Sequence, residues 1–181
     1  MLINSKKAEE SAILNLAYAV CAAARTAPKA CGIDHLDTAI LIGEDKDRIA
    51  AEMRKLAEDV GENGRHFRRD ANNVDASSAV VLIGAKYETR GLGEMCKLCG
   101  FANCGACEKA GAACVFTSID LGIALGSAVS LVADNRIDNR IMFTIGQAAA
   151  KLGLLGDHKL VMGIPLSASG KSVFYDRADW K

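Results

Sequence analysis

The stretch Ala79-Val-Val-Leu-Ile-Gly84 is a continuous apolar run between more polar segments. A run of this length without polar alternation predicts a β-strand that is buried on both faces. Two other short apolar runs, at 36–43 and 158–163, predict further strands. A strand that is covered on both faces needs helices above and below it, so the run predicts a small central sheet flanked by helices.

The segments around these strands have helical periodicity. Residues 6–27 are rich in Ala and Leu, with apolar residues one helical turn apart from Ile13 to Val20, and Pro28 ends this helix. Residues 45–60 are amphipathic with the same period, and the polar segment 61–73 is compatible with a short helix. Helices that alternate with a few short strands predict the α+β class.

Two capping-box patterns predict where later helices start. Thr117-Ser-Ile-Asp120 is expected to open a helix that extends to residue 132, and Asn135-Arg-Ile-Asp138 to open one that extends to residue 152. Pro165 is expected to end the last strand, because proline cannot donate a hydrogen bond to a strand ladder.

Length and composition fit one domain over residues 1–181. The 22 Lys and Arg residues balance 22 Asp and Glu residues, and the only basic run, Arg65–Arg69, is short, which argues against a nucleic-acid partner. The start of the chain has no apolar signal-peptide region, and the longest strongly apolar stretch, 121–133, is too short to span a bilayer. We therefore expect a cytoplasmic protein without a membrane partner.

The most specific chemical signal is a group of cysteines. Thiolates repel one another unless a cation or a cluster offsets their charge, and dense thiolates select iron–sulfur clusters, zinc or copper(I). Five of the seven cysteines form one C-x2-C-x4-C-x2-C-x6-C segment: Cys96, Cys99, Cys104, Cys107 and Cys114. A disulfide framework is disfavoured, because such frameworks belong to small secreted domains that cannot build a core. The segment therefore predicts a metal or cluster loop.

Zinc is the alternative to an iron–sulfur cluster. Paired C-x2-C knuckles suit tetrahedral zinc, but zinc knuckles are usually about 12–20 residues apart. The gap here, between Cys99 and Cys104, is four residues. Spacings of two and four recur in loops that wrap iron–sulfur clusters, and small residues such as Gly100 and Gly105 let backbone N–H groups approach the cluster sulfurs. The spacing favours an iron–sulfur cluster.

Five cysteines compete for four ligand positions. The stretch from Cys96 to Cys104 resembles the C-x2-C-G-[FY]-x2-C opening of four-iron cluster domains in anaerobic redox proteins. The fourth ligand is then Cys107 or Cys114, and the remaining thiol is an alternative ligand, a free thiol or a redox-active one. Arg90 and Lys97 flank these cysteines and are candidates for tuning the charge of a cluster.

The order of elements resembles the FMN-dependent nitroreductase family. The resemblance rests on the segment Ala23-Ala-Arg25-Thr-Ala-Pro28, on the strand after it, and on Lys159-Leu-Val-Met-Gly163-Ile-Pro165. The whole chain resembles a prokaryotic family described as carrying a ferredoxin-like domain, in which a cysteine-rich insertion precedes the central helix of a nitroreductase-like body. That resemblance implies one nitroreductase-like domain with an insertion at about 87–114.

The same resemblance implies FMN bound at a homodimer interface. Arg25, Lys29 and Lys171 are the positions that it assigns to flavin contacts. Two features depart from the family. The N-terminal Arg-x-Ser-x-Arg that holds the FMN phosphate has no match, and Lys29, Ala30, Cys31 and Gly32 replace the small polar residues and Asn that usually follow the proline.

These observations predict an iron–sulfur redox protein. Its fullest form is an FMN-dependent oxidoreductase that passes electrons between flavin and a [4Fe–4S]-type cluster, with a redox partner protein. The alternative is a zinc-stabilised structural or interaction protein on the same scaffold without flavin chemistry. A third hypothesis, cluster or metal trafficking, rests on the fifth cysteine. No catalytic residue is predicted.

Overall fold

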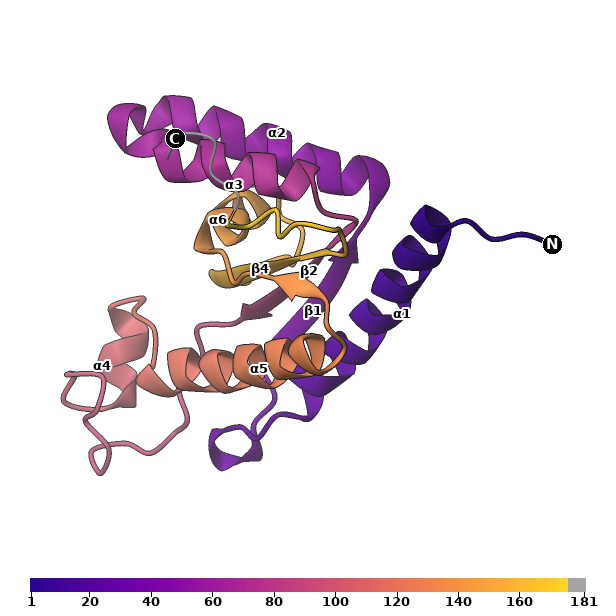
Figure 1. The fold of residues 1–181 in the computed structure, drawn as a ribbon. Coiled ribbons are helices and arrows are strands. Elements are labelled where there is room, and N and C mark those ends of the chain that lie inside the picture. The colour runs from indigo at the N-terminus through magenta and orange to yellow at the C-terminus, as the bar shows by residue number, and fades with distance from the viewer. Residues whose placement is uncertain (176–181) are drawn as a thin grey trace.

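The structure, a computed structural model, describes residues 1–175. Its centre is an antiparallel sheet in the order β1 (Leu36–Leu41), β2 (Ala79–Ala85), β4 (Leu160–Ser167), β3 (Asp138–Asn139) (Figure 1). The predicted class, a small sheet flanked by helices, is confirmed. The two-residue strand β3 was not predicted, because two residues carry no periodicity.

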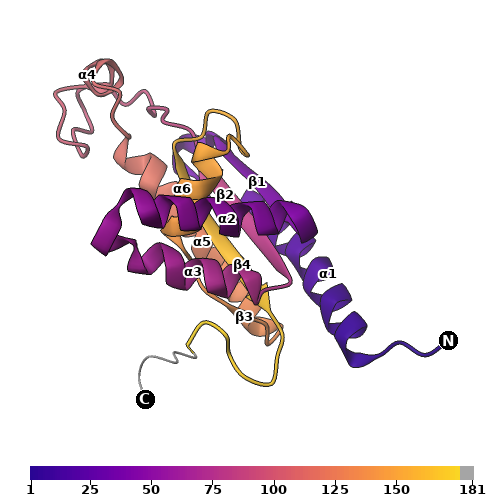
Figure 2. The same cartoon turned by 90° about the horizontal axis from the view of Figure 1, so that it is seen from above.

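Helices cover both faces of this sheet (Figures 1 and 2). On one face lie α1 (Ser5–Thr26) and α5 (Val115–Asp134). On the other lie α2 (Gly43–Asp59), α3 (Arg65–Asp75) and α6 (Phe143–Lys151). The shorter elements are η1 (Ala30–Gly32), η2 (Gly61–Gly64) and α4 (Cys104–Lys109).

Strand β2 joins the two halves of the core, as its sequence predicts. All seven of its residues are buried. Val81 and Ile83 belong to the core with α1 and α5, whereas Val80 and Leu82 belong to the core with α2, α3 and α6. This alternation follows from the two-residue side-chain period of a strand. Parallel sheets usually show such double burial, but here an antiparallel strand has it because both faces carry helices.

The capping-box predictions are wrong. Helix α5 begins at Val115, with Cys114 as its N-cap, so Thr117 and Asp120 lie inside the helix and are buried. Asp120 bonds to partners outside its own helix, which outweighs the local pattern. Asp138 starts β3 instead of a helix.

Pro165 lies inside β4 and does not end it. The N–H of Gly163 donates to Met142 on the β3 side, so the nitrogen of Pro165, two residues on, faces the same side. The ladder there is interrupted between the pairs Leu166–Asn139 and Gly163–Met142. No ladder bond is lost at Pro165 on that side, and the strand continues to Ser167.

Helix α5 is longer than the predicted apolar stretch. It spans 20 residues with a mean hydropathy of 1.8, and by length and composition it is the one helix among the described residues that could cross a membrane. The expectation that the stretch is too short is therefore wrong. In this fold α5 packs against α1 and β2, and 39 % of its apolar window is buried.

Candidate metal centre

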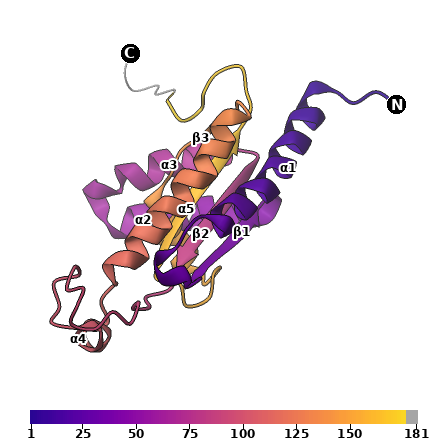
Figure 3. The ribbon, with the colours of Figure 1, turned by 90° about the horizontal axis from the view of Figure 1, so that it is seen from below.

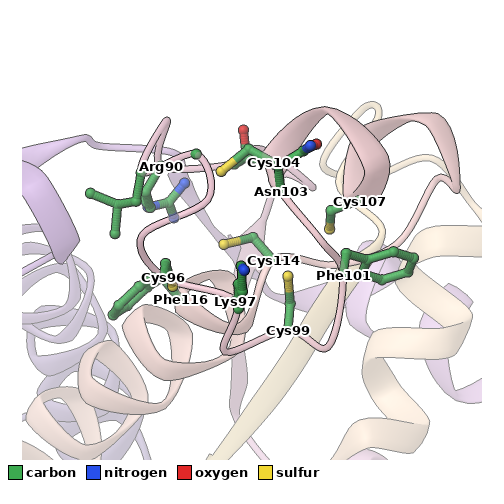
Figure 4. Close-up of a pocket in the computed structure, with 13 residues that line it drawn as sticks. Arg90, Cys96, Lys97, Cys99, Phe101, Asn103, Cys104, Cys107, Cys114 and Phe116 are labelled. Carbon is green, nitrogen blue, oxygen red and sulfur yellow. The ribbon is translucent and has the colours of Figure 1, made fainter.

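The five clustered cysteines lie in the segment between β2 and α5. This segment, which contains α4, extends from one end of the molecule (Figures 1 and 3). All five thiols are free and line one pocket, together with Arg90, Lys97, Phe101 and Phe116 (Figure 4). The structure therefore brings together the whole predicted ligand set.

Local turns position these cysteines. Gly100 donates its N–H to the carbonyl of Lys97 at 3.0 Å, which closes a turn around Cys99. Asn103 caps α4 by accepting from the N–H of Ala106 at 2.9 Å. Cys104 and Cys107 are then one helical turn apart and share a face. Cys114 follows as the N-cap of α5.

Cys107 is the most buried of the five, with no exposed surface. Its thiol donates to the carbonyl of Ala112 at 3.5 Å. Burial raises its pKa most, and a hydrogen bond with Cys99 and the nearby charges of Cys99, Cys114 and Cys104 raise it further. Four of the thiols therefore interact closely, and a bound cation or cluster would relieve their mutual repulsion.

The spacing of the thiols differs from that of a single-ion site. Among residues 1–175, no three His, Cys, Asp or Glu side chains converge closely enough to hold one metal ion. Tetrahedral zinc needs four ligand atoms at about 2.0–2.3 Å. The wider arrangement and the all-sulfur donor set fit a multi-atom cluster better than one zinc ion. The side chains leave only about 10 Å³ free, so the loop must widen to admit a cluster.

A buried ionic network borders this pocket. The side chain of Arg90 is 1 % exposed, and its Nη2 lies 3.0 Å from Oδ2 of Asp120 on α5. Its Nη1 donates to the carbonyl of Glu88 at 2.8 Å, and Nη2 lies 2.8 Å from Nδ1 of His35. The other carboxylate oxygen of Asp120 accepts from the N–H of Ala30 at 3.0 Å. The network ties the cysteine segment and α5 to the loop after α1.

The sequence analysis missed this network, apart from naming Arg90 as a candidate for charge tuning. His35, Arg90 and Asp120 come from three segments far apart in the sequence, and no local spacing connects them. The one available signal was Asp120 inside an apolar helix, and the capping pattern gave it a different explanation.

Arg25 and Lys29, two of the predicted flavin contacts, bind acceptors of their own chain. Arg25 donates to Asp34 at 2.7 Å and to Asp37 at 3.1 Å, and these bonds, led by that to Asp34, raise its pKa. Lys29 donates to the carbonyl of Ala27 at 3.0 Å, at the C-terminal end of α1. In this arrangement both cations hold the junction between α1 and β1.

Lys171, the third predicted contact, lies at the other end of the sheet. Asp37, the partner of Arg25, is level with Gly84 and Val161 in the strand register. Lys171 follows β4, which ends at Ser167, six residues beyond Val161. At about 3.3 Å per residue, this is roughly 20 Å. The three residues do not form one flavin-phosphate site within a single chain.

Solved structures share this fold. A nitroreductase with bound FMN from Desulfitobacterium hafniense is 14 % identical and superposes over 94 % of this chain and 81 % of its own with a TM-score of 0.57. The nitroreductase CinD from Lactococcus lactis, in complex with chloramphenicol, is 16 % identical over 93 % of this chain and 86 % of its own, with a TM-score of 0.56. At these identities the likeness shows the fold alone, which is nitroreductase-like.

Sequence comparison goes further. A protein of Archaeoglobus fulgidus, described as an uncharacterized protein, is 44 % identical over the full length of both chains. Residues 110–177 match the family described as "uncharacterized protein containing a ferredoxin domain (DUF2148)". The chain belongs to this ferredoxin-domain family and carries its cysteine segment on a nitroreductase-like fold.

Proposed function

We propose that this protein is an iron–sulfur redox protein whose cluster is held by the segment between β2 and α5. The observation that carries the proposal is the convergence of all five clustered cysteines on one pocket. The family description, which names a ferredoxin domain, and the likeness to FMN-containing oxidoreductases support a redox role. A bound cluster of the [4Fe–4S] type would supply one-electron transfer.

We assign the four ligand positions to Cys99, Cys104, Cys107 and Cys114. The support is electrostatic: Cys99, Cys104 and Cys114 all act on the thiol of Cys107, whereas Cys96 is not among the groups that shift it. Cys96 is half-buried and is then the fifth, non-ligating thiol. The resemblance of the Cys96–Cys104 stretch to four-iron domains argues instead for Cys96, so the test must distinguish these two.

The rest of the pocket protects such a cluster. Phe101, Phe116 and Leu92 line it, and aromatic and aliphatic walls exclude water. Burial of this kind is one of the means by which proteins set cluster potentials. This chain's own contribution is therefore to bind the cluster, orient it and keep it dry.

The test is anaerobic purification followed by visible absorption and assays of iron, sulfide, zinc and flavin. We expect a broad band near about 400 nm with iron and sulfide in the wild type. Serine variants of Cys99, Cys104, Cys107 and Cys114 should lose most of the iron, and Cys96→Ser should retain it. Cys31→Ser, at an exposed cysteine outside the pocket, is the matched control.

Two outcomes would overturn the proposal. A colourless wild-type protein with stoichiometric zinc would establish the zinc-stabilised scaffold in its place. Full iron retention in Cys99→Ser would remove the ligand assignment, because Cys99 is common to every quartet considered.

FMN is the second cofactor to which the fold points, since a nitroreductase of similar fold binds it. Arg25, Lys29 and Lys171 do not fit one flavin site within a chain, so we assign them no step in electron transfer. Flavin released from the same purified sample, measured by fluorescence, tests whether FMN is present.

We further propose two protein partners. The first is a second copy of this chain on the outer face of α5, where Ile119 and Ile123 are 43 % and 41 % exposed beside Gly122. The second is a redox partner at the cysteine segment, where Met95 and Leu98 are 81 % and 65 % exposed. Exposed apolar side chains next to a cluster suit a transient electron-transfer contact.

A further inference from the structure

Arg90 is a buried cation in the wall of the cysteine pocket. Its side chain is 1 % exposed, and it lines the pocket with the five thiols (Figure 4). A buried guanidinium normally has every N–H satisfied. Both terminal nitrogens of Arg90 have partners, but Nε is buried and has no hydrogen-bond partner among the described residues. One donor is therefore left over at the site where thiolates gather.

The anchoring of Arg90 fixes where that donor lies. Asp120 accepts from Nη2 and is 2 % exposed in its side chain, yet it does not line the pocket. The carbonyl of Glu88 accepts from Nη1. Arg90 thus lies between the pocket and its anchors, held from the side away from the thiols. A guanidinium held by two of its nitrogens has little freedom to turn the third.

We propose that Arg90 sets the reduction potential of the cluster by donating from Nε to a cysteine thiolate or a cluster sulfide, with Asp120 as the positioning residue that holds it. The inference rests on the proposed function. Hydrogen bonds to cluster sulfurs stabilise the more negative, reduced state and raise the potential. The Arg90 side chain itself neither gains nor loses a proton or an electron.

Lys97 provides the contrast. It lines the same pocket and carries the same charge, but its side chain is exposed to solvent. Solvent and salt screen an exposed charge much more than a buried one. Lys97→Gln therefore removes one positive charge from the pocket without removing a buried donor, which makes it the matched control.

The experiment is a potentiometric titration of the anaerobically purified protein, followed by EPR of the reduced cluster. Loss of a charge-assisted hydrogen bond costs enough to change the one-electron reduction constant about tenfold, which is about 59 mV. We expect a downward shift of this size in Arg90→Met and in Arg90→Lys, which keeps the charge but lacks Nε. Asp120→Asn should give a smaller shift, and Lys97→Gln almost none.

A second variant covers the case in which Arg90→Met leaves Asp120 unpaired and fails to fold. Arg90→Met with Asp120→Leu removes both buried charges together, and it should show the same downward shift. An unchanged potential in Arg90→Lys and in the double variant, with wild-type iron content, would overturn the inference alone. Absence of a cluster from the wild type would instead overturn the proposed function.

Discussion

Cys107 shows how one residue can be both well buried and chemically unfinished. Burial is the larger cause of its raised pKa, and the neighbouring thiols add to it. A cysteine whose folded-state pKa is raised keeps its proton at neutral pH. Its contribution to the stability of the metal-free protein is full below the ordinary thiol pKa and is lost as the pH rises through the folded value.

This predicts slow alkylation of Cys107. In the reduced, metal-free protein at pH 7.5, iodoacetamide should modify Cys107 at least about tenfold more slowly than exposed Cys31, because the thiolate is the nucleophile. The rate at Cys107 should still be rising at pH 9. Peptide mass spectrometry over a pH series measures both sites in one sample. Equal rates at the two cysteines would contradict the burial and the pKa direction together.

Elements were predicted well where a pattern was long and local. The apolar run of β2 and the periodicity of α1 were sufficient, because their burial follows directly from their sequence. The pattern at Thr117–Asp120 misled, because a tertiary partner, Arg90, takes the carboxylate that the pattern assigned to a helix cap. The ligand set was predictable since it is contiguous; the network around Arg90 was not, because folding alone assembles it.

The packing of α6 on β4 depends on two glycines. A Cβ on Gly146 would lie 1.7 Å from the carbonyl oxygen of Val161, and one on Gly163 would lie 2.1 Å from Cγ2 of Ile145. Gly146→Ala should therefore lower the free energy of unfolding by about 1–3 kcal/mol or more, since backbone atoms cannot yield as side chains do. Chemical denaturation measures this change.

Gly122→Ala on α5 is the matched control. A Cβ there meets nothing within 4 Å, so alanine should stabilise the helix by up to about 1 kcal/mol. A Gly146→Ala protein as stable as the wild type would show that α6 does not lie as close to β4 as described.

At the scale of the molecule, the fold places two kinds of surface at different sites. The cysteine segment extends from one end, whereas the exposed apolar face of α5 runs along a flat side (Figure 3). A helix with a mean hydropathy of 1.8 and only 39 % of its window buried leaves much apolar surface uncovered. Soluble proteins rarely leave such a surface open, which is why we propose a second copy there.

This arrangement predicts that association and cluster binding can be separated. Ile123→Glu places a charge in the middle of the proposed contact, so it should shift the protein from dimer to monomer in light scattering while iron content stays at the wild-type level. Val60→Glu, at a similarly exposed apolar residue at the end of α2, should leave the dimer intact. A wild-type monomer, or a dimer that tolerates Ile123→Glu, would contradict the proposed interface. Loss of iron in the monomer would show that the cluster segment depends on the partner copy.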